Sequence, residues 1–215
     1  MTKKQILDAL KTGGIVPVIR ADSAGSAVRV SEALLAGGIR TLEITMTVPD
    51  ALSAMRTVAQ RLGDDVLLGA GTVTDAHMAS AALDAGARFL VSPCVADDVI
   101  RVAREQDVPV LPGALTPTEV FHAHRLGGDI IKIFPASAVG GPAYIKALKG
   151  PFPSIDFCPT GGVNLETIGE FIKSGCVAVG VGGELVLKGA IQTGDFWRIT
   201  ELAHRYTAAV ADARR

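Results

Sequence analysis

The stretch that decides the fold runs from residue 41 to residue 71: T-L-E-I-T-M (41–46), D-A-L-S-A-M-R-T-V-A-Q-R-L-G (50–63) and V-L-L-G-A-G (66–71). Two short β-rich runs enclose a segment with helical period, which ends in the glycine expected just past a helix C-terminus. A strand, a helix and a second strand in this order predict two parallel strands joined by a right-handed crossover.

The same unit repeats along the chain. Further β-rich runs lie at 15–20, 89–93, 108–112, 129–134, 155–160 and 177–182, with helical segments between them. Eight units in about 200 residues is the size of a compact (β/α)8 TIM barrel. An open doubly wound sheet is the alternative, but it usually needs fewer strands. The start of the chain and the stretch 197–210 predict an extra N-terminal helix and a C-terminal closing helix.

Composition indicates one soluble globular domain over residues 1–215, since no linker, repeat or low-complexity stretch divides the chain. The formal net charge is -1 and no basic cluster is visible, so nothing favours a nucleic acid or an anionic membrane as partner. No apolar run approaches the ~18 to 20 residues of a membrane helix. The N-terminus lacks a signal-peptide pattern, which predicts a cytoplasmic protein.

Lys132 stands inside the apolar run D-I-I-K-I-F-P (129–135). Strands of a parallel barrel are covered on both faces, so the lysine is expected to be buried whichever way it points. Burial disfavours the ammonium, and the neutral amine is the form that attacks a carbonyl to make a Schiff base. A structural lysine paired with a carboxylate is the alternative. Because buried lysines are rare, we favour the catalytic interpretation.

Glu43 is a second charged residue in the middle of a strand, between Leu42 and Ile44. The simplest account pairs it with Lys132 across the barrel. It could be the structural counter-ion of the lysine, or it could move protons during Schiff-base chemistry, with a pKa tuned by burial. The residues themselves leave these two roles open.

Two glycine pairs follow the last two predicted strands, in C-P-T-G-G-V-N (158–164) and G-V-G-G-E-L (180–185). Glycines let backbone N–H groups approach an anion, and this fold often binds phosphate in the corresponding loops. Tight turns also explain glycine pairs, but their position favours phosphate. Other polar residues expected at the carboxyl ends of strands are Arg20, Thr45, Thr72, Ser92 and Thr160.

The sequence predicts no metal site. His122 and His124 lie two apart on a helix and face different ways, and there is no H-E-x-x-H motif or close Asp/Glu cluster. The three cysteines, Cys94, Cys158 and Cys176, are an odd number at wide spacing, which suits neither a disulfide framework nor a zinc site, so we expect them to be reduced and mostly buried. Cys94 could line the pocket, although a core thiol is the more frequent outcome.

Several strings occur in order over nearly the whole chain: E-I-T-M-T-V-P, G-A-G-T-V, S-P, P-G-A-L-T-P-T-E, K-I-F-P, P-T-G-G-V-N and G-V-G-G-E-L. The ordered set closely resembles the 2-keto-3-deoxy-6-phosphogluconate (KDPG) / 4-hydroxy-2-oxoglutarate (KHG) aldolase family. The resemblance implies a class I aldolase without metal or cofactor, on a trimeric (β/α)8 barrel. Its substrate would be 2-dehydro-3-deoxy-6-phosphogluconate, cleaved to pyruvate and glyceraldehyde 3-phosphate. The unphosphorylated 4-hydroxy-2-oxoglutarate could be a second substrate, cleaved to pyruvate and glyoxylate.

The resemblance also implies roles for single residues. Lys132 matches the Schiff-base lysine and Glu43 the general acid/base. The implied substrate-binding residues are Arg20, Thr72, Pro93 and Thr160, and the implied phosphate-binding amides are those of Gly161, Gly162, Gly182 and Gly183.

The chain departs from part of the family at two positions. Some members hold the substrate carboxylate with an arginine where this chain has Thr47, while others have the arginine at the end of strand one, here Arg20. We expect Arg20 to hold the carboxylate; the alternative is an ion pair with Asp22 or with another acidic residue at the rim. Many members have serine where Gly183 stands.

The stretch K-I-F-P-A-S-A-V-G-G-P-A-Y-I-K-A-L-K (132–149) also resembles 6-phosphogalactonate aldolases, so that epimer is an alternative substrate. A phosphate-binding isomerase or epimerase, or a silent phosphosugar-binding protein, would not need both Lys132 and Glu43. The presence of both residues ranks these alternatives below the aldolase.

Overall fold

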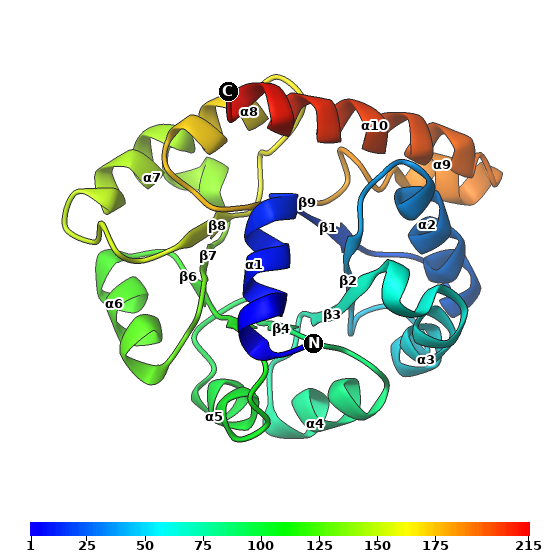
Figure 1. Ribbon diagram of the computed structural model, residues 1–215, viewed down its shortest axis with the longest axis horizontal. Helices are drawn as coiled ribbons and strands as arrows, with labels where there is room; N and C mark the ends of the chain where they lie inside the picture. Colours follow the sequence, from blue (N-terminus) through cyan, green and yellow to red (C-terminus); the bar gives the residue numbers. More distant parts are fainter.

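The computed structural model describes residues 1–215 and has an α/β fold (Figure 1). The strands are β1 Ile15–Ile19, β2 Thr41–Thr45, β3 Leu67–Gly71, β4 Leu90–Val91, β5 Val110–Leu111, β6 Gly113–Ala114, β7 Ile131–Ile133, β8 Phe157–Pro159 and β9 Val179–Val181. The α-helices are α1 Lys3–Gly13, α2 Ala24–Ala36, α3 Ala51–Leu62, α4 Ala76–Asp84, α5 Asp97–Glu105, α6 Pro117–Leu126, α7 Pro142–Lys149, α8 Ile168–Lys173, α9 Lys188–Thr193 and α10 Phe196–Ala213. Two short 3₁₀ turns, η1 Gly63–Asp65 and η2 Ala136–Val139, complete the elements.

All strand pairs are parallel, as the strand–helix alternation predicts. One sheet has the order β5-β4-β3-β2-β1-β9 and a second has the order β6-β7-β8. An isolated parallel bridge joins Thr160, just after β8, to Gly180 of β9. Because parallel strands end at the same edge, the polar residues that follow them lie on one side of the molecule.

The strands differ from the predicted runs at their ends. The run 108–112 gives only the short strand β5, and a further short strand, β6, follows Pro112 outside that run. Proline has no N–H to donate to a ladder, so the chain stops pairing with β4 at this point and pairs with β7 beyond it. The run 89–93 is reduced to β4 because Ser92 and Pro93 turn out of the strand.

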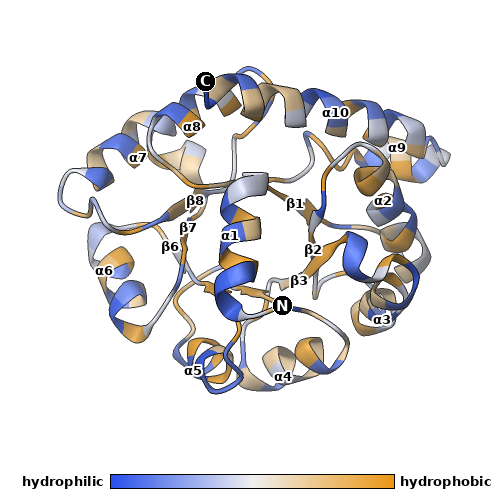
Figure 2. Cartoon of the chain, viewed as in Figure 1, coloured by the Kyte–Doolittle hydropathy of each residue, from blue (hydrophilic) through white to orange (hydrophobic).

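Helices lie at both ends of the chain. Helix α1 begins with a capping box in which Thr2 and Gln5 exchange hydrogen bonds, and it lies across the amino-terminal ends of β1 and β2 (Figure 1). Helix α10 packs between α2 and α8. The outer helices turn their apolar faces toward the strands and their polar faces outward (Figure 2).

The apolar core has two parts. The larger part lies between the strands and the surrounding helices. The smaller part is enclosed by the strands, where Ile6 and Leu10 of α1 cover Val16, Leu67, Phe89 and other inward side chains. Apolar side chains therefore fill the interior below the level of Glu43 and Lys132, and the polar groups lie above them.

The expectation for the cysteines is confirmed for Cys158 and Cys176, which are buried, and is wrong for Cys94, which is exposed. Burial raises the pKa of both buried thiols, that of Cys176 to about 12. Cys94 lies in the loop after β4, where its carbonyl accepts a hydrogen bond from the Ser92 hydroxyl at 2.7 Å. None of the helices has the length and apolar character needed to cross a membrane.

Candidate active site

Lys132 is buried in the middle of β7, with 5% of its surface exposed. Its backbone pairs with Gly113 of β6 and Cys158 of β8, which fixes the direction of the side chain. The Nζ atom lies 5.3 Å from the centre of the Phe134 ring, so the lysine and this phenyl group share a face as the period of two predicts. The predicted burial of the lysine is confirmed.

Glu43 is buried in β2, with 2% of its surface exposed. Its Oε1 atom is the one buried side-chain nitrogen or oxygen atom in the chain without a hydrogen-bond partner. Burial raises the pKa of this carboxyl, against the opposing attraction of Lys132 and Arg20. An unpartnered buried carboxyl is costly, and such groups are typical of sites that act on a ligand.

Glu43 and Lys132 do not form a direct ion pair, although each lies in the electrostatic field of the other. A counter-ion role would bring the two groups into contact, since a buried pair gains most of its attraction at short range. The separation therefore favours the second role left open by the sequence, in which the carboxyl exchanges protons with something held near the amine.

Two inward glycines make room for these side chains, a feature that the sequence patterns did not reveal. A Cβ atom on Gly71 of β3 would lie 1.9 Å from Oε1 of Glu43, and one on Gly180 of β9 would lie 2.1 Å from Oγ1 of Thr160. No side chain fits at either position without moving the polar group. The local signal was present, because both glycines alternate with apolar residues inside strands, where glycine often marks a close approach.

Thr72 follows β3 directly and has a backbone φ of 57°, in the left-handed region. A β-branched residue rarely adopts this conformation, which costs about 1–3 kcal/mol and occurs most often at functional sites. The strain turns the chain at the carboxyl end of the strand next to Glu43, because β2 and β3 are paired along their whole length. This observation marks the same position that the family resemblance singled out.

Arg20 follows β1 at the same rim and is exposed. It makes no ion pair, so the alternative in which it pairs with Asp22 is not observed. The guanidinium lines a cavity of about 430 Å³ together with Thr47 and Gly183, and attracts the Glu43 carboxylate. One of its terminal nitrogens is 3.9 Å from the position of a Cβ atom on Gly182.

Thr45 and Thr47 support this corner. The buried Thr45 hydroxyl donates to the carbonyl of Ile19 at 3.0 Å, and the two threonine hydroxyls are hydrogen-bonded at 2.8 Å. The carbonyl of Ile19 is part of the peptide that leads into Arg20. Thr45 therefore holds the backbone beside the arginine, and Thr47 supports the Thr45 hydroxyl without supplying a cation of its own.

The two glycine pairs present unused donors. The N–H groups of Gly161, Gly162, Gly182 and Gly183 make no hydrogen bond within the chain. Gly161 and Gly162 have φ values of 96° and 75°, which residues with a Cβ rarely adopt. Unpaired backbone N–H groups gathered at the ends of two neighbouring strands can bind an anion.

Thr160 is buried, with its N–H donating to the carbonyl of Ile133 at 2.9 Å, so it lies beside the strand of Lys132. Pro93 is half-buried, and its carbonyl carbon lies 2.3 Å from where a Cβ atom on Gly113 would be. Apart from Lys132 and Glu43, which lie within β7 and β2, the predicted site residues follow strands at one rim. No three His, Cys, Asp or Glu side chains gather where they could hold a metal ion.

A parallel α/β protein with a buried amine, a separate buried carboxyl and free amides at one rim has the arrangement of an enzyme for a small anionic carbonyl compound. The comparisons with known proteins agree. The family model "KDPG and KHG aldolase" matches residues 6–202. A 2-dehydro-3-deoxy-phosphogluconate aldolase of Pseudomonas aeruginosa is 39% identical over 94% of this chain and 91% of its own.

Two solved structures extend the comparison. The KDPG aldolase of Legionella pneumophila, with pyruvate captured at low pH as a covalent carbinolamine intermediate, is 33% identical with a TM-score of 0.86, covering 93% of this chain and 97% of its own. A native KDPGal structure is 32% identical with a TM-score of 0.85, covering 93% of this chain and 95% of its own. The chain belongs to the KDPG and KHG aldolase family and is an aldolase, a carbon–carbon lyase.

Proposed function

We propose that the protein is a class I aldolase that cleaves 2-dehydro-3-deoxy-6-phosphogluconate to pyruvate and glyceraldehyde 3-phosphate. The observation that carries this proposal is the buried Lys132 amine beside a separate, protonatable Glu43 carboxyl. The amine attacks the substrate ketone to give a carbinolamine, which loses water to form an imine. Cleavage then leaves an enamine of pyruvate, and protonation followed by hydrolysis releases it.

Glu43 transfers protons in these steps. Its raised pKa keeps the carboxyl able to give and accept a proton closer to neutral pH than an exposed glutamate can. Arg20 binds the carboxylate of the keto acid, with Thr72, Pro93 and Thr160 around the rest of the substrate. The amides of Gly161, Gly162, Gly182 and Gly183 bind the phosphate, and their lack of internal partners supports this role.

The unphosphorylated 4-hydroxy-2-oxoglutarate is a second substrate, because it carries the same keto acid end that reacts with the lysine. The 6-phosphogalactonate epimer is the alternative, supported by the similarity to a native KDPGal structure. A coupled assay with both phosphorylated epimers and the unphosphorylated acid ranks the three by kcat/KM.

The test of the mechanism is reductive trapping. Borohydride with pyruvate inactivates the enzyme, and peptide mass spectrometry places a reduced pyruvyl adduct on Lys132. The matched control is Lys149→Met, which removes another lysine and leaves trapping intact, whereas Lys132→Met prevents it. An adduct on another lysine, or activity lost to a chelator, would show that the mechanism is wrong.

We extend the proposal to the architecture. The strands close into one (β/α)8 barrel that forms a single domain over residues 1–215. Three features support closure: β9 lies next to β1, only Pro112 separates β5 from β6, and the Thr160–Gly180 bridge links β8 to β9. The homotrimer and the cytoplasmic location stay predictions, and sedimentation velocity tests the first.

A further inference from the structure

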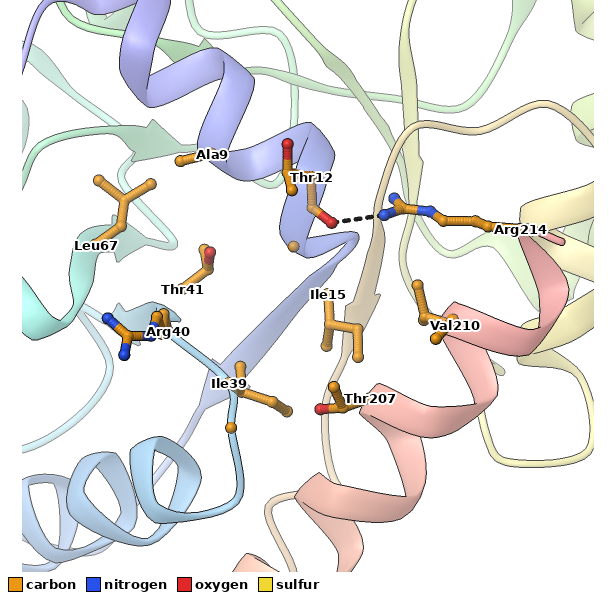
Figure 3. Close-up of a pocket in the computed structure, with 13 residues that line it drawn as sticks. Ala9, Thr12, Ile15, Ile39, Arg40, Thr41, Leu67, Thr207, Val210 and Arg214 are labelled. Carbon is orange, nitrogen blue, oxygen red and sulfur yellow. Dashed lines mark hydrogen bonds between the residues drawn. The ribbon is translucent and has the colours of Figure 1, made fainter.

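A second cavity lies at the opposite end of the strands from Lys132 and Glu43. It has a volume of about 400 Å³ and is enclosed by α1, α10 and the first residues of β1, β2 and β3 (Figure 3). This volume is within the range of small-molecule sites. The first residues of β1 and β2, Ile15 and Thr41, line it, whereas the proposed catalytic groups lie farther along the strands.

The walls of this cavity are mainly apolar. Ile15, Ile39, Leu67 and Val210 contribute their side chains from four different segments, as Figure 3 shows. The apolar surface remains uncovered although α1 and α10 lie on either side of it. A ligand that removed this surface from water would gain binding free energy in proportion to the apolar area covered.

One hydroxyl group on the cavity wall has no hydrogen-bond partner within the chain. It belongs to Thr41, a residue that is only 4% exposed as a whole. The hydroxyl opens onto the cavity, so a ligand held there can hydrogen-bond to it in place of water. The hydroxyl of Thr207, on the opposite wall, already donates to the carbonyl of Ala203 at 2.9 Å.

The charge of the cavity is positive. Its lining includes Arg40 and Arg214 and no aspartate or glutamate. Arg214 donates to the carbonyls of Lys11, Thr12 and Val177 and has no acidic partner, so its charge is fixed in place but not neutralised. Arg40 has only a distant contact with Asp65, at 4.0 Å between exposed side chains.

We infer that this cavity is a binding site for a small organic carboxylate with a compact apolar body. The apolar walls contact the apolar body of the ligand, and the Thr41 hydroxyl donates to a carboxylate oxygen. The guanidinium groups of Arg40 and Arg214 supply positive charge that balances the carboxylate. This site is separate from the proposed aldolase site, so both can be occupied in one molecule.

Binding is measured directly, so the test does not depend on aldolase activity. The probe is phenylacetate, titrated by NMR against phenylacetamide, which has the same body without the charge, and against inorganic phosphate, which has charge without the body. Phenylacetate is expected to bind more tightly than either. Equal affinity for phenylacetamide would overturn the anion site, and equal affinity for phosphate would overturn the role of the apolar walls.

Substitutions of residues that line the cavity test whether phenylacetate binds there. Ala211→Trp fills the cavity from the exposed side of α10 and is expected to abolish binding. Thr41→Val keeps the shape and should weaken binding roughly 2- to 10-fold, the value of one hydrogen bond. Arg40→Gln should weaken it about 2- to 5-fold, as for an exposed ion pair.

The matched control is Arg56→Gln, which removes an exposed arginine of α3 outside the cavity and should leave affinity unchanged. A melting curve for each variant checks that it is folded. If the folded Ala211→Trp protein still binds phenylacetate, the probe lies elsewhere and the inference is wrong. If Ala211→Trp does not fold, the two milder variants decide: unchanged affinity in both would equally overturn the site.

Discussion

Several polar groups at the carboxyl ends of the strands lack partners, whereas polar groups at the amino ends are paired. At the carboxyl ends, Glu43 has an unpartnered oxygen, Thr72 is in a strained conformation, and four glycine N–H groups have no acceptor. At the amino ends, Lys3 pairs with Asp129 at 2.9 Å, Lys11 pairs with Asp156 at 2.6 Å, and Arg214 donates to three carbonyls.

The difference shows which end is built for stability. Unpaired buried groups and backbone strain each cost free energy of folding, so a chain keeps them where another molecule will satisfy them. Satisfied groups and packed apolar side chains stabilise the fold whether or not a ligand is present. The Thr41 hydroxyl, which has no partner within the chain and opens onto the second cavity, is the exception at the amino end.

The difference between the two ends of the strands predicts the largest loss of activity for a substitution of Glu43. Glu43→Gln removes the proton-transfer group while keeping its shape, so kcat should fall about 10²- to 10⁴-fold. Steady-state kinetics with the phosphorylated substrate measures the loss. A variant with nearly normal turnover would make Glu43 a structural residue and remove the main contrast between the two ends.

Glu43→Gln should also change how the free energy of unfolding depends on pH. Burial raises the pKa of Glu43, so the unfolded carboxyl ionises at lower pH than the folded one. As the pH rises above the ordinary value of 4.5, the unfolded state binds fewer protons and the wild type loses stability relative to Glu43→Gln. Urea titrations from acid to neutral pH measure the difference, and the opposite slope would contradict the raised pKa.

The second prediction concerns the amino end. Leu10 of α1 is completely buried under the strands. Leu10→Ala should lower the free energy of unfolding by about 2–5 kcal/mol, because it removes apolar contact and leaves a cavity. The kcat of the folded enzyme should remain within about twofold of wild type, since α1 contacts none of the proposed catalytic groups. A large loss of kcat in the folded fraction would mean that the two ends are coupled.

Sequence patterns predicted much of this division. Alternating strand and helix periods predicted parallel strands with their polar residues at one rim, and charged residues inside apolar runs identified Lys132 and Glu43. Local patterns could not show the strain at Thr72, or that the close approach signalled by Gly71 is to Glu43, because both depend on how neighbouring strands are placed. The second cavity depends on the contact of α1 with α10, whose residues are about 200 positions apart in the chain.

The third prediction tests which end of the substrate Arg20 binds. Arg20→Ala should lower kcat/KM by roughly 10- to 150-fold, the range for a hydrogen bond to a charged group. Exposure of the guanidinium favours the lower part of this range. The loss should be the same for phosphorylated and unphosphorylated substrates, because both carry the carboxylate. A loss confined to the phosphorylated substrate would assign Arg20 to the phosphate, as its closeness to Gly182 also allows.

The smallest expected effect is tighter substrate binding after Gly183→Ser. This variant tests whether a side chain at position 183 can add a hydrogen bond to the substrate that the glycine cannot make. A Cβ atom on Gly183 would meet nothing within 4 Å, and the residue does not have a positive φ. Gly183→Ser should therefore fold normally and place a hydroxyl beside the proposed phosphate position. One added hydrogen bond should lower KM for the phosphorylated substrate roughly 2- to 10-fold and leave KM for the unphosphorylated substrate unchanged.

The matched control is Gly162→Ser. Its new Cβ atom would lie 2.4 Å from that of Ser137, and the residue has a φ of 75°, so this variant should lose stability. If Gly183→Ser changes KM equally for both substrates, the loop after β9 contacts a part that they share, and the phosphate must bind elsewhere.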